Sequence, residues 1–308
     1  MPKFKKRSSR RSFKTKTVSY LLESGSIKGI RQAKETTNEL LKYHWAYYSE
    51  LARQRNEIQD KIQQAVIQTC IPYELTHWQR AVKYKYGLHP FSTVGSLSFI
   101  GGRFNTGKGV NTEVPYFSGL YIAENKDTAL QEHLGQVKHD QLTPREVALT
   151  NPASETIVSI SGKIDKVFDL TNEKNLLPLI ELIKDFKLSP ELKKLSKKLG
   201  FSSPEIIKTP ELLIQSLLTP EWRQLPTNYD IPANSQIFGH IVHQAGIEGI
   251  LYPSKLTACL CLVVFPKNFV GTDSYLKLDD EAPHGKVPAR IDTSNWRVCD
   301  LETKEIID

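Results

Sequence analysis

Four residues of this chain have side chains suited to holding a phosphorylated substrate. Arg103 follows a predicted strand and two glycines, and Tyr121 lies in the next predicted strand. Glu132 falls in the helix after it, and Ser254 ends a later strand. A guanidinium presents a planar fork of donors to phosphate or ribose oxygens. A carboxylate stabilises positive charge in a transition state, a tyrosine ring can stack on a cationic ring, and a serine hydroxyl donates to a phosphate or ribose oxygen.

The helix predicted over residues 125–136 decides where Glu132 points. Leu130 and Leu134 stand four positions apart and form an apolar pair on one face of this helix. Glu132 therefore lies on a different side from the buried face. Its carboxylate can face either the solvent or a site, because exposed glutamates are common.

The pattern after residue 80 predicts an α+β fold with strands at both ends of a helical region. Strands are predicted at residues 96–100, 120–122, 157–160, 167–168, 249–252 and 259–265. Helices are predicted at residues 125–136 and 235–245, and over most of 174–218, where Pro190, Pro204 and Pro210 divide the pieces. Gly246 is the expected glycine after the second of these helices.

The N-terminal part of the chain predicts helix. Residues 36–68 carry apolar side chains at every third or fourth position, which indicates one long helix or two shorter ones. Thr37 with Asn38 is the expected cap, and Pro72 closes the segment. The apolar stripe is most simply explained by packing against the main domain, and it is also a candidate docking or dimer surface.

The positive charge of the chain is concentrated at its start. The 308 residues carry a formal net charge of +7, but residues 1–16 alone contribute eight basic groups and no acidic one. The remainder has 33 basic and 34 acidic groups. This nearly neutral body argues against a protein that binds nucleic acid over its whole surface. The basic segment is interpreted as a flexible charged tail, with weak nucleic-acid contact or an organelle transit peptide as alternatives.

Other patterns exclude further classes of protein. The longest apolar run, residues 258–265, has 8 residues and is too short to span a membrane. Residues 102–109 have the spacing of a P-loop, but Gly109 stands where the magnesium-binding Ser or Thr is required. His240 and His243 can share a helix face without a third ligand, which favours packing or surface histidines over a metal site. The four cysteines form no C-x-x-C pair, which fits free thiols in a reducing, cytoplasmic compartment.

Four short motifs occur in order along the chain. They are Arg103-Phe104-Asn105, Tyr121-Ile122-Ala123, Ala129-Leu130-Gln131-Glu132 and Tyr252-Pro253-Ser254. Together they resemble the RES domain family, which is named for its Arg, Glu and Ser. The resemblance covers about residues 80–270. It implies an ADP-ribosyltransferase-like fold, a mixed sheet around a cleft, to which this chain adds an N-terminal helical extension.

The resemblance implies a toxin that consumes NAD and is held in check by an antitoxin with a helix-turn-helix domain. Arg103, Glu132 and Tyr121 are then the catalytic residues, and NAD is bound by Arg103, Tyr121, Ser254, Asn105 and Lys108. Breaking the nicotinamide–ribose bond generates an oxocarbenium-like ribose, which suits a carboxylate at Glu132. No metal and no permanently bound cofactor are implied, because NAD is the substrate and inorganic phosphate a candidate co-substrate.

These observations leave the acceptor of ADP-ribose open. Transfer to inorganic phosphate is the reading that we favour, with transfer to a protein and hydrolysis as alternatives. A different class of function is a non-enzymatic protein that binds nucleic acid through residues 1–16. We divide the chain into a flexible tail at 1–20, a helical extension at 21–78 and a RES-like catalytic domain at 79–308. A homo-oligomer is a further possibility that the sequence leaves open.

Overall fold

The computed structural model describes residues 24–110, 114–134, 155–201 and 206–300. The tail predicted at 1–20 lies outside these residues, as do Pro204 and the last two residues of the helix predicted over 125–136. Within the described residues, no helix combines the length and the apolar character that a membrane span needs.

The centre of the fold is a mixed β-sheet. Its strands are β1 (Ile71–Lys83), β4 (Leu120–Ala123), β5 (Glu155–Asp169), β6 (Gly249–Pro253), β7 (Leu260–Val264), β8 (Tyr275–Leu278) and β9 (Arg290–Asp292). β2 (Gly101–Gly102) and β3 (Asn105–Thr106) form a separate two-stranded hairpin. The strand order is β1-β4-β7-β6-β5-β8-β9. β5 and β6 pair in parallel, and the other pairs in this order are antiparallel. The predicted α+β class with a mixed sheet is confirmed.

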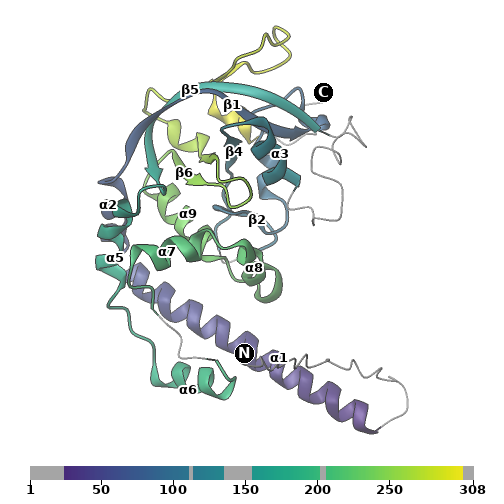
Figure 1. The fold of residues 1–308 in the computed structure, drawn as a ribbon, viewed down its shortest axis with the longest axis vertical. Helices are drawn as coiled ribbons and strands as arrows, with labels where there is room; N and C mark the ends of the chain where they lie inside the picture. The colour runs from purple at the N-terminus through teal and green to yellow at the C-terminus, as the bar shows by residue number, and fades with distance from the viewer. Residues whose placement is uncertain (1–23, 111–113, 135–154, 202–205, 301–308) are drawn as a thin grey trace, which may run out of the picture.

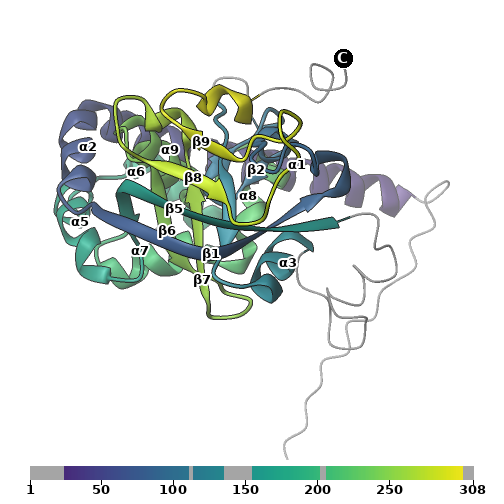
Figure 2. The ribbon, with the colours of Figure 1, turned by 90° about the horizontal axis from the view of Figure 1, so that it is seen from above.

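The sheet closes on itself through its two longest strands. β1 pairs with β4 and also, antiparallel, along most of β5, so the strands β1, β4, β7, β6 and β5 complete a circuit. Figure 1 shows β1 and β5 side by side as long curved strands at one end of the molecule. In the view from above, β6 and β7 run across them (Figure 2). The resulting curvature gives the sheet a concave and a convex side, each with its own core.

Side chains alternate between these two cores along the central strands. On β7, Cys261 and Val263 belong to the core that the helices cover, whereas Leu262 and Val264 belong to the other core. On β4, Leu120 and Ile122 enter this second core as well. Tyr121 therefore points to the helix-covered side, the side on which the candidate site is built.

The helices pack mainly on that side. They are α1 (Ser24–Glu57), α2 (Gln59–Ile67), α3 (Lys126–Leu134), α5 (Leu177–Ile183), α6 (Pro190–Lys198), α7 (Pro210–Leu217), α8 (Gln224–Tyr229) and α9 (Asn234–Gln244), with short 3-10 turns η1 (Tyr84–Tyr86), η2 (Val94–Leu97), η3 (Glu173–Leu176), η4 (Pro220–Arg223), η5 (Pro266–Phe269) and η6 (Trp296–Cys299). In Figure 1, α7 and α8 lie between the sheet and α1.

The same local sequence starts three of the helical segments between β5 and β6. Ser189, Thr209 and Thr219 each precede a Pro-Glu dipeptide, and their hydroxyls accept a backbone N–H of the first turn. The proline fits the first helical position, where no partner for its nitrogen is needed, and the glutamate favours the positive end of the helix. Of the prolines that predicted the divisions, Pro190 and Pro210 are therefore helix starts. Gly246 follows the end of α9 with a φ of +72°.

The N-terminal extension is helical, as predicted, but its limits differ. The helix begins at Ser24, so Thr37 and Asn38 lie inside α1 instead of capping it, and the break to α2 falls at Ile58. Ile71–Lys83 is the strand β1, so the extension predicted at 21–78 ends near residue 70. Residues 71–83 do not alternate regularly between polar and apolar side chains, because register shifts against β5 at 71/73 and 75/78 place the buried Leu75 and Trp78 three positions apart.

Three further elements differ from the predictions. Residues 96–100, predicted as a strand, form the end of η2 and a turn before β2, since Phe99 has a left-handed φ of 48°. The two strands predicted at 157–160 and 167–168 are one continuous strand, β5. β8 and β9 lie in a C-terminal stretch for which no strand was predicted. The strands at 120–122, 249–252 and 259–265 and the helix at 235–245 are confirmed.

Candidate functional site

Arg103 and Phe104 form the tip of the tight hairpin between β2 and β3. Gly101 adopts a φ of +88°, which only glycine does without strain. A Cβ at Gly102 would collide with the hydroxyl of Tyr121 and with the side chain of Asn105. The two glycines before the arginine are therefore required by the fold of the hairpin and by the closeness of Tyr121.

Asn105 is the buried hub that holds this hairpin. Its amide nitrogen donates to the carbonyls of Ser96 at 2.8 Å and Phe117 at 2.9 Å. Its amide oxygen accepts the backbone N–H of Gly102 at 3.1 Å and the hydroxyl of Tyr121 at 2.8 Å. All four hydrogen-bonding positions of the amide are thus used by the protein. In the structure this side chain positions the hairpin, and its contact with NAD stays a prediction.

The phenol of Tyr121 joins the sheet to the hairpin. Its oxygen accepts the backbone N–H of Phe104 at 3.0 Å while its proton goes to Asn105. Burial raises the pKa of Tyr121 above its ordinary value; the Phe104 N–H and Arg103 oppose this rise and Glu132 adds to it. The tyrosine therefore stays protonated at neutral pH and lies within electrostatic reach of both Arg103 and Glu132.

Helix α9 supports the hairpin from behind. The buried side-chain amide of Gln236 donates to the carbonyls of Ile100, Gly102 and Asn105 at 2.7–3.1 Å. At Gly239, one turn further on, a Cβ would collide with the carbonyl of Phe104, so only glycine allows the helix to approach this closely. The hairpin that carries Arg103 is consequently held from the sheet side and from the helix side.

The guanidinium of Arg103 is oriented by the helical region that precedes α9. One of its nitrogens, Nη1, donates to the carbonyl of Thr219 at 2.8 Å and, at 3.4 Å, to that of Leu217 at the end of α7. The guanidinium carbon lies 5.8 Å from the ring centroid of Trp222, which is 4% exposed. Trp222 is thus a buried anchor, and it also forms a platform under the arginine.

Helix α3, which carries Glu132, is fastened to the sheet and to the turn between β6 and β7. The side-chain oxygen of Asn125 accepts the backbone N–H of Thr128 at 2.9 Å and so caps the first turn of the helix. The hydroxyls of Thr128 and Thr257 bond to each other at 2.9 Å. At the other end of the helix, His133 pairs with Glu155 of β5 at 2.9 Å. These contacts fix the helix whose half-buried Glu132 faces Ser254.

Ser254 and Glu132 are in direct contact although 122 positions separate them in the sequence. The hydroxyl of Ser254 donates to Oε1 of Glu132 at 2.6 Å. The backbone N–H groups of Leu256 and Thr257 donate to the same hydroxyl oxygen at 3.1 and 3.3 Å. The serine had been expected to donate to a phosphate or to ribose. Its proton instead goes to the carboxylate, so Ser254 positions Glu132.

Sequence reasoning missed one cation at this site, Arg223. Its guanidinium lies 4.5 Å from the ring centroid of Trp222, the same indole that underlies Arg103. Partial burial lowers the pKa of Arg223 and repulsion from Arg103 adds to this, whereas Glu132 opposes it. The only signal in the sequence was its position next to Trp222. Two guanidinium groups and one carboxylate thus share a small volume around Tyr121.

The residues of this site lie inside a match to a known protein family. The RES domain family model matches residues 77–284, which is about two thirds of the chain. The chain belongs to the RES family. No curated protein matches the sequence significantly. Among solved structures, a chain from the crystal structure of the M. tuberculosis MbcT–MbcA toxin–antitoxin complex is similar, with a TM-score of 0.41 and 15% identity over 77% of this chain and 95% of that chain.

The RES domain thus brings Arg103, Tyr121, Glu132 and Ser254 to one side of the curved sheet. Lys108 is exposed, with its ammonium 5.7 Å from the ring centroid of Tyr116, and its contact with NAD stays a prediction. A cavity of about 290 Å³ lies between α1, α2 and α9, and a second one of about 110 Å³ lies beside it toward α5 and α7. Neither cavity is lined by Arg103, Tyr121, Glu132 or Ser254. Within the described residues, no three metal-ligating side chains converge.

Proposed function

We propose that this RES domain consumes NAD by breaking the bond between nicotinamide and ribose and transferring ADP-ribose to inorganic phosphate. The observation that carries the proposal is the 2.6 Å hydrogen bond from Ser254 to Glu132, beside the hairpin of Arg103. This bond connects Glu132 and Ser254, the Glu and the Ser after which the family is named. It leaves the other carboxylate oxygen of Glu132, Oε2, to face a substrate.

The carboxylate of Glu132 supplies the stabilisation that this reaction needs. When the C1–N bond breaks, its electron pair leaves with nicotinamide and positive charge spreads over C1 and the ring oxygen of ribose. A carboxylate held in place lowers the energy of that charge without reorganising during the reaction. A phosphate oxygen then forms the new bond to C1. The products are nicotinamide and ADP-ribose 1″-phosphate, and no oxidant or reductant is needed.

The two arginines suit the anionic part of NAD. Nη1 of Arg103 is held by the end of α7, and its remaining donors are available to pyrophosphate or ribose oxygens. Arg223, on the same indole, adds a second guanidinium. Two like charges placed close together repel each other, and a bound anion relieves this repulsion. We assign the pyrophosphate, or the incoming phosphate, to this pair.

The biological role that follows is that of a toxin in a toxin–antitoxin system. An enzyme that destroys NAD in the cytoplasm would harm the cell that makes it, so a second protein must restrain it. An antitoxin segment with carboxylates would match the two arginines by charge. We expect production of this chain alone to arrest growth while NAD falls, and production of the cognate antitoxin to restore both. Unchanged growth and NAD at a high level of the protein would contradict the toxin role.

The decisive experiment is incubation of the purified protein with NAD, with and without phosphate, followed by identification of the products. Phosphorolysis yields ADP-ribose 1″-phosphate only when phosphate is present. Free ADP-ribose would indicate hydrolysis, and labelled protein would indicate protein ADP-ribosylation. We expect Glu132→Gln to lower turnover by about 10²–10³-fold. Asp127→Asn, an exposed carboxylate on the same helix, is the matched control with normal turnover. Intact NAD in the wild-type reaction would refute the enzymatic proposal.

A further inference from the structure

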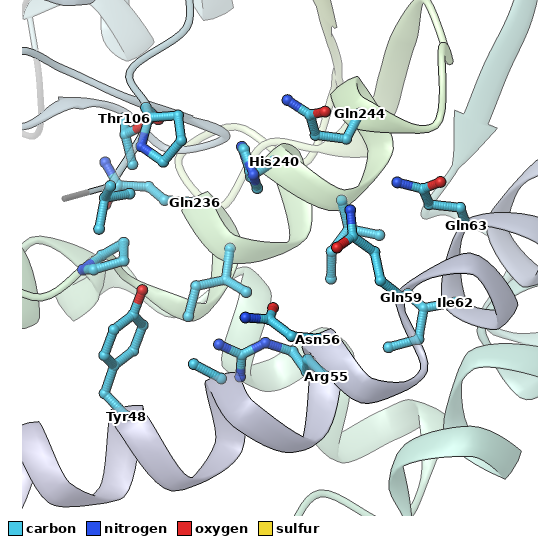
Figure 3. Close-up of a pocket in the computed structure, with 16 residues that line it drawn as sticks. Tyr48, Arg55, Asn56, Gln59, Ile62, Gln63, Thr106, Gln236, His240 and Gln244 are labelled. Atoms are coloured by element: carbon cyan, nitrogen blue, oxygen red, sulfur yellow. The ribbon is translucent and has the colours of Figure 1, made fainter.

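The N-terminal extension and the RES domain enclose a cavity of about 290 Å³. Figure 3 shows Tyr48, Arg55 and Asn56 of α1 on one side of it and His240 of α9 on the other. Helices α1 and α2 lie before residue 77, where the family match begins. One wall of this cavity is therefore built by helices that lie outside the residues matched by the family model.

The lining of the cavity has one full cation and no acid. None of its lining residues is Asp or Glu, and Arg55 is its one arginine or lysine. In the described part of the chain, no carboxylate forms an ion pair with Arg55, whose guanidinium carbon lies 5.9 Å from the ring centroid of Tyr48. By contrast Arg53, two positions earlier, is exposed and pairs with Glu57. A half-buried guanidinium with no counter-ion in a cavity without acids selects for an anion.

Further polar groups converge on the same space. The side-chain amides of Asn56, Gln59 and Gln63 reach it from α1 and α2, and that of Gln244 reaches it from α9 (Figure 3). The ring nitrogen Nδ1 of His240 is buried and has no hydrogen-bond partner among the described residues. Buried polar groups are normally paired. The lining thus offers one buried nitrogen that the protein itself does not satisfy, together with side-chain amides that border the same space.

A smaller apolar cavity of about 110 Å³ lies next to the polar one. Arg55, Ile62, Ile237 and Ile241 line both, and the rest of the smaller lining is mostly Leu, Ile and Phe from α5, α7 and their neighbours. The two spaces together present an anion-binding polar end and an apolar end. The polar cavity has the volume of about ten water molecules.

We infer that the cavity between the N-terminal extension and α9 is a binding site for a small organic anion, with one carboxylate or phosphate group held by Arg55 and an apolar body directed toward Ile237 and Ile241. Such an occupant would contact α1, α2 and α9 together. It would also contact Gln236, which supports the hairpin of Arg103, and Thr106 of β3. Occupancy therefore stabilises the docking of the extension on the RES domain.

The test uses benzoate and phenyl phosphate as probes, with benzamide as the neutral analogue of benzoate. A ligand at about ten times its Kd raises the Tm of a protein of this size by about 2–4 °C. We expect this rise for the full-length wild-type chain with at least one of the two anions, and none with benzamide. Arg55→Gln should abolish it, and the matched variant Arg53→Gln should keep it. The Glu132→Gln variant should also keep it, so failure of the NAD proposal leaves this result intact.

A second variant protects the test against misfolding of Arg55→Gln. Ala52 lines the polar cavity from α1, and Ala52→Leu would fill part of the space without touching the charge. We expect Ala52→Leu to weaken probe binding at least tenfold in a calorimetric titration. The proposal is overturned if neither anion affects the wild-type chain, if benzamide acts as strongly as benzoate, or if the folded Arg55→Gln or Ala52→Leu variant retains the full response.

Discussion

Ser254→Ala separates a serine that positions Glu132 from one that binds the substrate. The variant removes the 2.6 Å hydrogen bond to the Glu132 carboxylate, together with the acceptor of the Leu256 and Thr257 N–H groups. Hydrogen bonds to a charged group contribute about 1.5–3 kcal/mol. If that energy holds the carboxylate in its productive orientation, its loss lowers kcat by about 10- to 100-fold, at 1.36 kcal/mol for each factor of ten. The KM for NAD should change little, because the lost contact lies within the protein.

The double variant with Glu132→Gln decides how Ser254 acts. If the serine works only through the carboxylate, removing both costs little more than removing Glu132 alone, so the two effects are not additive. Ser254→Thr, which keeps a hydroxyl, should recover part of kcat. Ser294→Ala is the control, because it removes a hydroxyl-to-carboxylate hydrogen bond of the same length, to Asp292 at the end of β9, that takes no part in holding Glu132. A raised KM with fully additive effects would refute the positioning role and would instead indicate direct contact with NAD.

Ser254→Ala also has a predicted cost in stability. Ser254 is 3% exposed, and its oxygen accepts the backbone N–H groups of Leu256 and Thr257. Leaving buried donors without a partner costs about 1–3 kcal/mol. We therefore expect a lower midpoint of urea unfolding with an unchanged m-value, and activity must be compared at a temperature where both proteins are folded.

Three further variants test other parts of the chain. Tyr121→Phe leaves the N–H of Phe104 without its acceptor and should lower the free energy of unfolding by about 1–3 kcal/mol, measured by urea titration; an unchanged midpoint would show that the hairpin does not depend on this phenol. Arg223→Gln should raise the KM for NAD about tenfold with a smaller effect on kcat, and an unchanged KM would place this arginine outside the substrate site. Deletion of residues 1–16 should remove salt-sensitive binding to polyanions and leave NAD turnover intact, whereas a folded truncated protein without turnover would show that the tail belongs to the active site.

Much of the fold could be predicted because local rules and the tertiary structure agree. Short apolar runs predicted β4, β6 and β7, and the spacing of apolar side chains predicted α3 and α9. β1 and the full length of β5 could not be predicted, since these strands are defined by their pairing with each other across about 80 positions. Register shifts in the β1–β5 pair interrupt the period of two that would otherwise mark these strands in the sequence.

Within the site, the sequence alone determined which residue types occur and in which order. Arg103, Tyr121, Glu132 and Ser254 stand in motifs that are local, and Gly101, with its positive φ, is a local requirement of the hairpin of Arg103. Such features are readable without a structure because they depend on neighbours in the chain.

Only the tertiary structure decided what these residues do to one another. Closure of the sheet brings α3 against the turn after β6, and so directs the hydroxyl of Ser254 at Glu132. The same folding turns Asn105 inward as a hub, places Arg223 beside Arg103 on one indole, and encloses a cavity behind the hairpin. Hydrogen bonds and repulsion act between atoms a few ångströms apart, and residues more than 100 positions apart reach that distance only through the fold.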